Sequence, residues 1–337
     1  METEAPGDAS HPPQNGSHST DTESARDLPS AEVTGLYGNS AAIKRVRRLV
    51  ALYARSTTAT VVVHGETGTG KELVARGLHR LGPRANTPFV AANVAALPEG
   101  LAESMLFGHE RGAFTSAYVR HRGLFEVADK SLLFLDEVAE LSLPMQARLL
   151  RVLETGELRA VGAERTRTVS VRLVVATHTP LAPLVALGAF RADLFFRLHG
   201  LAITIPPLRE HIEDLDVIAK ALLARATNDI GTRRLSPDAV RALSSYAWPG
   251  NVRQLSNVLL RAAAHTAREE LDAHVVADAL ASEPRTAFQI QADTSIETIR
   301  SVLRANGGRL APAARILGMA RSTLRAKIRR HAIVTEP

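Results

Sequence analysis

Short apolar runs alternate with stretches of helical periodicity along the first two thirds of the chain. Four mostly apolar runs lie at residues 60–63, 88–92, 131–135 and 171–177. Runs of this kind suit strands that are buried on both faces of a sheet. Between them, apolar residues recur at helical spacing, for example at 42–53 and 144–153. The pattern predicts an α/β fold, in which helices flank a parallel sheet.

The last third of the chain has only helical periodicity. Helix starts are predicted near Asp214, Ser236 and Pro249, which indicates an all-α subdomain. A second all-α unit has helical patterns before Gly307 and after Pro312, then a break at Gly318, and this is typical of a helix-turn-helix. The predicted divisions are a disordered acidic tail (1–33), an α/β subdomain (34–207), a helical lid (208–281), a linker (282–294) and a helix-turn-helix (295–337).

Composition and charge limit the cellular location and the kinds of binding partner that we expect for this protein. The chain has 337 residues and no cysteine, and neither a membrane-length apolar run nor a signal pattern is present, so we expect a cytoplasmic protein with no membrane partner. Residues 296–331 contain nine Lys or Arg against one acid, while residues 1–33 contain seven acids against one base. A basic C-terminal unit is typical of nucleic-acid binding, although a solvated basic helix would have the same charge.

A glycine-rich loop follows the first apolar run and precedes a helical pattern. Backbone N–H groups of such a loop turn inward around a phosphate, and a lysine reaches the outer phosphates. The alternative is a glycine turn that happens to precede a helix. The predicted nucleoside triphosphate site comprises Gly65, Glu66, Thr67, Gly68, Thr69, Gly70, Lys71 and Glu72. Because Glu72 replaces the hydroxyl that normally contacts Mg²⁺, the metal should depend more on an acid further along the chain.

Polar residues end three of the predicted strands. Asp136 and Glu137 follow the run at 131–135, at the sheet edge where ligands bind. Asp136 is predicted to hold Mg²⁺ and Glu137 to polarise the attacking water. Asn93 ends the preceding strand, with a turn asparagine as the alternative, and Thr177-His178 ends the next. An apolar strand that ends in two acids is common, but its position after a phosphate-binding loop favours catalysis.

Three arginines are candidates for phosphate contact. Arg191 and Arg197 flank a short helical segment rich in phenylalanine. They could pair with acids of their own domain or reach the γ-phosphate of a neighbouring subunit. Arg253 lies just inside a predicted helix after Trp248, where it could reach back over a phosphate.

The segment 107–123 contains small residues around one aromatic side chain, Phe114. If Phe114 is exposed, it suggests contact with a partner protein. The alternative is that it folds back onto its own domain. In the C-terminal unit, the second helix of the motif would enter the major groove of DNA. Its candidate DNA-binding residues are Arg321, Ser322, Thr323, Arg325, Lys327, Arg329 and Arg330.

In this order, the motifs resemble those of sigma-54-dependent transcriptional activators, a bacterial branch of the AAA+ ATPases. GETGTGKE resembles the Walker A motif, SLLFLDE Walker B, and WPGNVRQL sensor II with Arg253. FGHERGAFTSA resembles the loop that contacts sigma-54, over Gly112, Ala113, Phe114, Thr115, Ser116 and Ala117. The resemblance implies Asn93 as a switch for Glu137, and Arg191 and Arg197 as trans arginine fingers. It implies a ring, usually hexameric, that uses ATP and Mg²⁺, binds upstream enhancer DNA and remodels the sigma-54 RNA polymerase holoenzyme.

Two residues depart from the family pattern. Ser116 replaces a glycine and would strain the loop if its φ must be positive, and His178 replaces an asparagine at the sensor I strand. The 33-residue tail is too short for a sensory domain, so the chain is expected to lack one. The leading function is an ATP-hydrolysing activator. The alternatives are a DNA-binding repressor or architectural regulator whose AAA+ domain only oligomerises it, and an AAA+ remodeller of replication or repair complexes.

Overall fold

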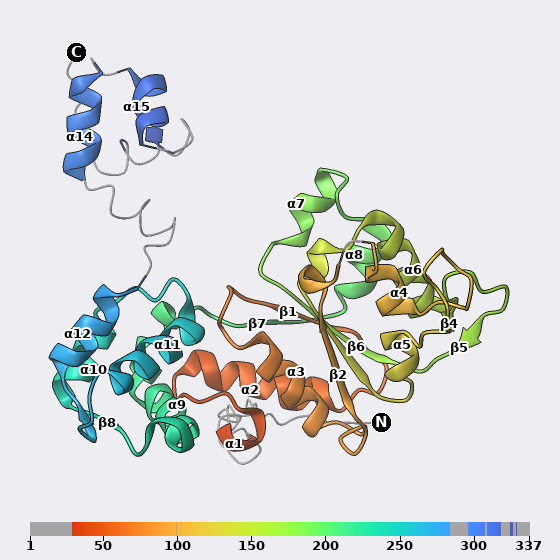
Figure 1. The fold of residues 1–337 in the computed structure, drawn as a ribbon, viewed down its shortest axis with the longest axis horizontal. Helices are drawn as coiled ribbons and strands as arrows, with labels where there is room; N and C mark the ends of the chain where they lie inside the picture. Colours follow the sequence, from red (N-terminus) through yellow and green to blue (C-terminus); the bar gives the residue numbers. More distant parts are fainter. Residues whose placement is uncertain are drawn as a thin grey trace, which may run out of the picture.

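The computed structural model describes residues 29–98, 100–283, 296–306, 309–317, 324, 325 and 328. Its main sheet has five parallel strands in the order β2-β3-β6-β1-β7. Figure 1 shows this sheet among the helices that surround it. The strands are β1 (Val61–His64), β2 (Phe89–Asn93), β3 (Leu132–Asp136), β6 (Arg172–Thr177) and β7 (Leu201–Thr204). Asn93 pairs with Asp136 and His64 with Thr177, so these strand ends meet at one edge of the sheet. The predicted α/β class is confirmed.

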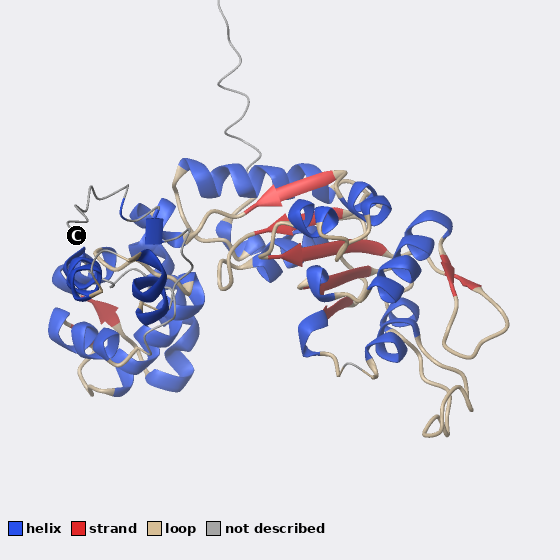
Figure 2. Cartoon of the chain, turned by 90° about the horizontal axis from the view of Figure 1, so that it is seen from above, coloured by secondary structure: helices blue, strands red, loops and turns tan. Residues whose placement is uncertain are grey.

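Helices cover both faces of this sheet, as Figure 2 shows. Successive strand residues point to opposite faces. In β3, Leu133 and Leu135 enter one core while Leu132 and Phe134 enter the other. The first core includes α4 (Ala102–Phe107), α5 (Leu124–Val127), α6 (Leu143–Thr155), α7 (Leu181–Ala186) and α8 (Ala192–Leu198); the second includes α2 (Ala41–Ala54) and α3 (Lys71–Arg80). The central strands β1, β3 and β6 are buried on both faces, and each therefore consists mainly of a continuous apolar run.

A separate helical unit lies beside the sheet and its flanking helices, and it has its own hydrophobic core. It contains α9 (Leu215–Ile230), α10 (Pro237–Ser244), α11 (Asn251–Ala264) and α12 (Ala273–Ala281). Trp248 is fully buried in this core, and its Nε1 donates to the carbonyl of Leu243 at 2.9 Å. The unit is not wholly helical, because β8 (Arg234–Leu235) pairs in parallel with β9 (Glu270–Leu271). Two-residue strands are too short to produce a periodic pattern in the sequence.

Several short elements connect these parts of the chain. They are α1 (Ala31–Thr34), the hairpin β4 (Glu157–Leu158) and β5 (Arg167–Thr168), and four 3₁₀ helices: η1 (Val94–Ala96), η2 (Val138–Glu140), η3 (Leu208–Glu210) and η4 (Ile212–Asp214). The tail predicted for residues 1–33 overlaps α1, where the side chain of Ser30 accepts a hydrogen bond from the Val33 amide. Residues 1–28 lie outside the described part of the chain.

The C-terminal unit is described through α14 (Ile296–Ala305) and α15 (Leu310–Ile316). Ile299 and Leu303 pack with Ala313, Ala314 and Leu324 in a small separate core. The prediction placed the start of the second helix at Pro312, but α15 begins two residues earlier. Proline is tolerated in a first turn because the amide there has no intrahelical partner.

Of the seven candidate DNA-binding residues, only Arg325 is described, and it is exposed. Arg321, Ser322, Thr323, Lys327, Arg329 and Arg330 lie outside the described residues. Throughout the described ranges, every helix is too short or too polar to cross a bilayer.

Candidate functional site

The glycine-rich loop between β1 and α3 is shaped around its backbone. Gly68 and Gly70 have φ of +83° and +98°, which side chains rarely allow, and a Cβ on Gly68 would clash with the Gly250 carbonyl. Lys71 is 6% exposed, and its Nζ donates to the carbonyls of Gly65 at 3.1 Å and Glu66 at 3.4 Å. The ammonium therefore lies within the curve of the loop, where a phosphate group would be bound.

The two acids at the end of β3 face this lysine. Glu137 Oε1 lies 3.7 Å from Lys71 Nζ, and the Glu137 amide donates to Asp136 Oδ1 at 3.1 Å. Burial raises the pKa of Asp136, the negative charge of Glu137 adds to this effect, and the charge of Lys71 opposes it. Glu137 has φ of +56°, a left-handed conformation that is strained for a non-glycine residue. Such strain is found most often where a side chain must be held for function.

His178 contacts Glu137 from the end of the neighbouring strand. Its Nδ1 lies 2.7 Å from Glu137 Oε2. An ionised carboxylate only accepts hydrogen bonds, so Nδ1 carries the proton in this pair. The sequence indicated that His178 departs from a family pattern, but it did not predict this contact. The sequence placed His178 at the end of a strand of the same sheet, but only the structure shows that this strand, β6, lies next to β3.

Asn93 lies at the same edge of the sheet, and its position agrees with both interpretations of the sequence. Its Oδ1 accepts a hydrogen bond from the Ala95 amide at 3.0 Å and so caps η1, which is the role of a turn asparagine. The residue also lines the cavity that contains Lys71, Asp136 and Glu137.

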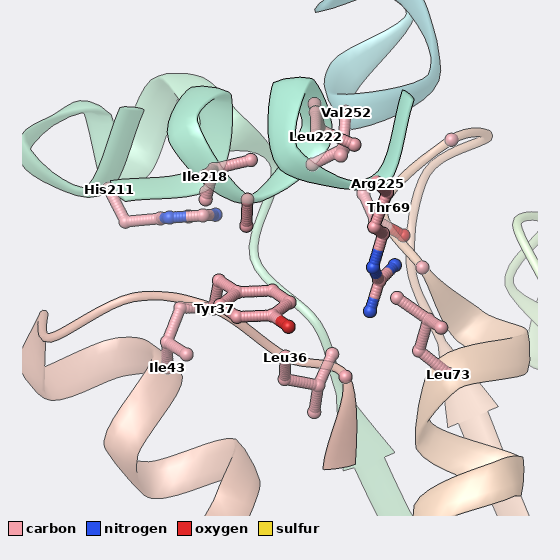
Figure 3. A pocket seen from close by; sticks show the side chains of 14 residues that line it. Leu36, Tyr37, Ile43, Thr69, Leu73, His211, Ile218, Leu222, Arg225 and Val252 are labelled. Carbon is pink, nitrogen blue, oxygen red and sulfur yellow. The ribbon is translucent and has the colours of Figure 1, made fainter. Parts of the chain in front are cut away.

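Two neighbouring cavities, which share lining residues such as Gly68 and Leu222, lie between the sheet and the helical unit. The larger one has a volume of about 530 Å³ and contains the charged groups. The smaller one, of about 90 Å³, is mainly apolar and is shown in Figure 3. Predicted site residues in the larger cavity are Thr67, Gly68, Gly70, Lys71, Glu72, Asn93, Asp136, Glu137 and Arg253. Thr69 lines the smaller cavity, while Gly65 and Glu66 line neither.

The sequence did not predict the apolar cavity. Its walls include Leu36, Tyr37, Ile43, Ile218, Leu222 and Val252. These residues come from the segment before α2 and from α2, α9 and α11, which are far apart in the sequence. In the sequence, each of these residues looks like any other apolar residue of a helix or loop, so nothing marks it as part of a cavity.

Glu66 and Glu72, both predicted to bind nucleotide, hold arginines of this chain. Arg209 contacts the Glu66 carboxylate through two nitrogens, at 2.7 and 2.8 Å, and hydrogen bonding to Arg209 lowers the pKa of Glu66. Asn251, fully buried at φ of +51°, donates to both Glu66 and the Thr67 carbonyl at 3.1 Å. Glu72 is half-exposed and pairs with Arg76 at 2.6 Å.

The contacts of Arg209 and Asn251 hold the glycine-rich loop against the helical unit, and so does the Arg253 amide, which donates to the Gly68 carbonyl at 3.2 Å. We call these contacts of Glu66 with Arg209 and Asn251 the clamp on Glu66. In this conformation Glu66 binds the helical unit.

Arg191 and Arg197 lie away from both cavities of their own chain. Arg191 precedes α8 and pairs with Asp193 at 2.7 Å, so pairing with an acid of the same domain, one of the two predicted alternatives, is observed for it. Hydrogen bonding to Asp193 raises the pKa of Arg191. Arg197 Nη2 donates to the Leu153 carbonyl at 2.8 Å. The structure therefore does not bring these arginines to the nucleotide cavity within one subunit.

The loop 112–117 does not fully expose the side chain of Phe114. Phe114 is half-buried, and its ring packs edge-on against His109 with centroids 4.8 Å apart. His109 is held in turn by Ser104 and the Val119 carbonyl. The fold-back alternative is thus observed in this conformation. Ser116 is not among the described residues with positive φ, so its backbone is unstrained in this conformation. The strain expected when the loop is engaged with ATP stays a prediction.

Comparisons with known protein families match three consecutive parts of the chain. Residues 36–204 match the Sigma-54 interaction domain, residues 209–293 the AAA+ ATPase lid domain, and residues 293–331 the bacterial regulatory proteins of the Fis family. The transcriptional regulatory protein ZraR of Salmonella typhimurium is 42% identical over 317 residues, which cover 91% of this chain and 72% of ZraR. The Nif-specific regulatory protein of Klebsiella oxytoca is 44% identical over 275 residues, covering 80% of this chain and 52% of that protein.

Solved structures give the same result. NtrX from Brucella abortus, crystallised with ATP, has a TM-score of 0.65 and 31% sequence identity, covering 88% of this chain and 68% of NtrX. A mutant of RuvB from Thermotoga maritima, at 15% identity and a TM-score of 0.52, shares the fold. The chain therefore belongs to the sigma-54-dependent transcriptional activators, a family of AAA+ ATPases with a Fis-type helix-turn-helix. It is an ATPase and a transcriptional activator, and the repressor alternative is not favoured.

Proposed function

We propose that this protein hydrolyses ATP as a hexameric ring in the cytoplasm and uses the energy to convert the sigma-54 RNA polymerase closed complex to the open complex. The observation that carries this proposal is the cluster at one cavity edge, where Lys71 Nζ lies 3.7 Å from Glu137 Oε1 beside Asp136. A cation that binds the phosphates and a carboxylate that orients the attacking water are among the groups that phosphoryl transfer requires from the protein.

In this proposal, each group has one task in ATP hydrolysis. The loop amides and Lys71 hold the outer phosphates, and Glu137 accepts a proton from the attacking water. His178 orients Glu137 through its hydrogen bond of 2.7 Å. Arg253 lines the same cavity and lies over the loop, where its guanidinium can contact a phosphate.

Mg²⁺ fits the donor set at this edge. Magnesium is commonly bound by one or two carboxylates together with substrate phosphates and water. Asp136 supplies such a carboxylate, and its raised pKa indicates a buried acid that a cation would stabilise in the charged form. Glu72 is already paired with Arg76, so we assign the metal to Asp136. When bound, the ion would neutralise charge on the phosphates.

The chain path supports a connection between the site and the loop. Asn93 ends β2 and caps η1, α4 follows η1, and the loop 112–117 follows α4. We propose that Asn93 reports the state of Glu137 along this path and that Gly112, Ala113, Phe114, Thr115, Ser116 and Ala117 contact sigma-54. Release of Phe114 from His109 would expose its ring to the partner.

Upstream DNA is the second proposed partner. We assign it to residues 295–337, joined through a linker at 282–294 to a lid at 208–281 and an α/β subdomain at 34–207. The charge of the C-terminal unit supports this assignment. DNA and RNA polymerase as partners support the cytoplasm as its location.

Phe114→Ala is expected to retain ATP turnover and DNA binding but to fail in open-complex formation. The reason is that the phenyl ring of Phe114 would contact the partner, whereas the groups for hydrolysis line the larger cavity, away from this loop. The measurement is open-complex formation on a sigma-54 promoter with holoenzyme and ATP.

Leu52→Ala is the matched control, because Leu52 is an exposed apolar side chain on α2, outside the loop, and its removal should change the yield little. A normal yield of open complex with Phe114→Ala would contradict the proposal that this loop contacts sigma-54. If the unmodified protein bound DNA and hydrolysed ATP yet formed no open complex on its own promoters, remodelling would be the wrong function.

A further inference from the structure

One fully buried polar side chain, Gln146 on α6, has no role yet in the proposed hydrolysis. Its helix packs against α8, which begins directly after Arg191 (Figure 1). The neighbours of Gln146 on α6, Met145 and Leu149, belong to an apolar core. Burial of an amide is unfavourable unless its polar groups find hydrogen-bond partners. The partners of Gln146 therefore indicate what its amide does.

The Gln146 amide binds three backbone groups. Oε1 accepts a hydrogen bond from the Arg191 amide at 2.8 Å. Nε2 donates to the carbonyls of Ala189 at 3.1 Å and Leu141 at 2.7 Å. Because a backbone N–H can only donate and a carbonyl can only accept, these partners allow one orientation of the side-chain amide. Gln146 thus joins α6 to the chain on both sides of Phe190.

The segment that Gln146 holds connects α7 to α8. The amide of Phe190 donates to the Leu184 carbonyl at 3.1 Å, and the Phe190 ring is buried. The Arg191 carbonyl accepts from the Phe195 amide at 3.0 Å and so begins α8. The Arg191 amide lies outside both helices and has one proton to donate, and Gln146 accepts it. Gln146 therefore fixes the point from which the Arg191 side chain extends.

The side chain of Arg191 is held less firmly than its backbone. Its guanidinium pairs with Asp193, but both side chains are more than 40% exposed. An ion pair this open to water contributes little, about 1 kcal/mol or less. A phosphate can therefore replace Asp193 at small cost. The buried contact with Gln146 is the firm anchor of Arg191.

We propose that Gln146 is a positioning residue for ATP hydrolysis in the neighbouring subunit, because it fixes the backbone from which Arg191 reaches across the interface. Gln146 itself lies outside both nucleotide cavities of its own chain. A displacement of 1 Å in a group that stabilises the reaction can lower the rate by about 10²-fold. The inference rests on the proposed ring and on a trans role for Arg191, and it adds the residue that holds the arginine.

The first test is Gln146→Met, which keeps the length of the side chain and removes its amide. In the full-length protein, kcat should fall by about 10²-fold. KM for ATP should stay nearly constant, because the phosphate-binding groups lie elsewhere, in the larger cavity. In the Arg191→Ala background, Gln146→Met should add little further loss, since both changes act through the same arginine.

A second test shows which nucleotide site Gln146 serves. The alternative is an effect on its own site, because Leu141 ends η2, which directly follows Glu137. Mixed with Glu137→Gln, Gln146→Met should gain turnover, because some interfaces combine an intact Glu137 with an intact Arg191. Mixed with Arg197→Ala, it should gain none, because neither variant presents both arginines intact. The reverse pattern would place the effect at its own site and overturn the proposal, as would normal kcat in Gln146→Met.

Met145→Ala controls for a general disturbance of α6, because Met145 lies beside Gln146 and packs in the core without an amide. It should lower the unfolding temperature but keep kcat. If Gln146→Met does not fold, Gln146→Ala replaces it, since the polar space it leaves can hold a water bonded to the same backbone groups. Its loss of kcat and its mixing pattern should be the same. If neither variant binds ATP, Gln146 is only structural and the proposal falls.

Failure of this inference can be distinguished from failure of the proposed ring. If Arg197→Ala and Glu137→Gln regain turnover on mixing while Gln146→Met does not behave like Arg197→Ala, only the role of Gln146 is overturned. If Arg197→Ala and Glu137→Gln regain nothing on mixing, the trans arrangement itself is wrong.

Discussion

Arg197→Ala is expected to lower ATP turnover by about 10³- to 10⁵-fold, the range over which an arginine finger acts. We expect Arg191→Ala to have an effect of the same kind. Both side chains lie outside the cavities of their own chain, where Arg191 pairs with Asp193 and Arg197 contacts the Leu153 carbonyl. If they stabilise charge on a γ-phosphate, that phosphate belongs to a neighbouring subunit. Turnover per subunit should then fall on dilution, as rings dissociate.

Mixing two inactive variants tests this trans arrangement directly. Arg197→Ala retains its own Glu137, and Glu137→Gln retains its own arginines. In mixed rings, some interfaces combine an intact Glu137 with an intact Arg197, so turnover should reappear. Arg151→Ala is the matched control, since Arg151 is an exposed arginine paired with Glu157 and should keep its activity. Constant turnover per subunit on dilution, with no recovery on mixing, would show that the arginines act elsewhere.

The sheet could be predicted because its strands are buried on both faces. Leu132 to Leu135 supply both cores, so their run is continuously apolar and easy to recognise. Parallel order then places Asn93, Asp136 and His178 at one edge. The strand β7 was not predicted, because two of its four residues, Ala202 and Thr204, are exposed and the run is short.

Contacts between distant segments could not be predicted in the same way. The clamp on Glu66 depends on Arg209 and Asn251, which lie more than 140 residues further along the chain. The position of Phe114 depends on the ring of His109, and the sequence left this packing open as one of two alternatives. Such contacts follow from how loops fold over the sheet, and residue type and spacing carry little information about them.

Glu137→Gln is expected to bind ATP but to turn it over about 10²- to 10⁴-fold more slowly, which is the usual contribution of a general base. The amide keeps the size of the side chain and loses the basic oxygen. Lys71→Ala should instead lose affinity, because the ammonium within the loop is removed. Single-turnover measurements with ATP bound in excess enzyme separate these two effects. Normal turnover in Glu137→Gln would remove the catalytic assignment.

His178 makes the same assignment testable from the other side of the hydrogen bond. Its Nδ1 holds Glu137 Oε2 at 2.7 Å, and an asparagine can place an amide N–H near the same point. We therefore expect His178→Asn to keep most turnover and His178→Ala to lower kcat while KM for ATP stays nearly constant, because a base that is no longer oriented still leaves the phosphate contacts intact. In the Glu137→Gln background, His178→Ala should add little further loss, since the two residues act as one unit. Additive losses in the double variant would mean that His178 affects hydrolysis by a route other than Glu137.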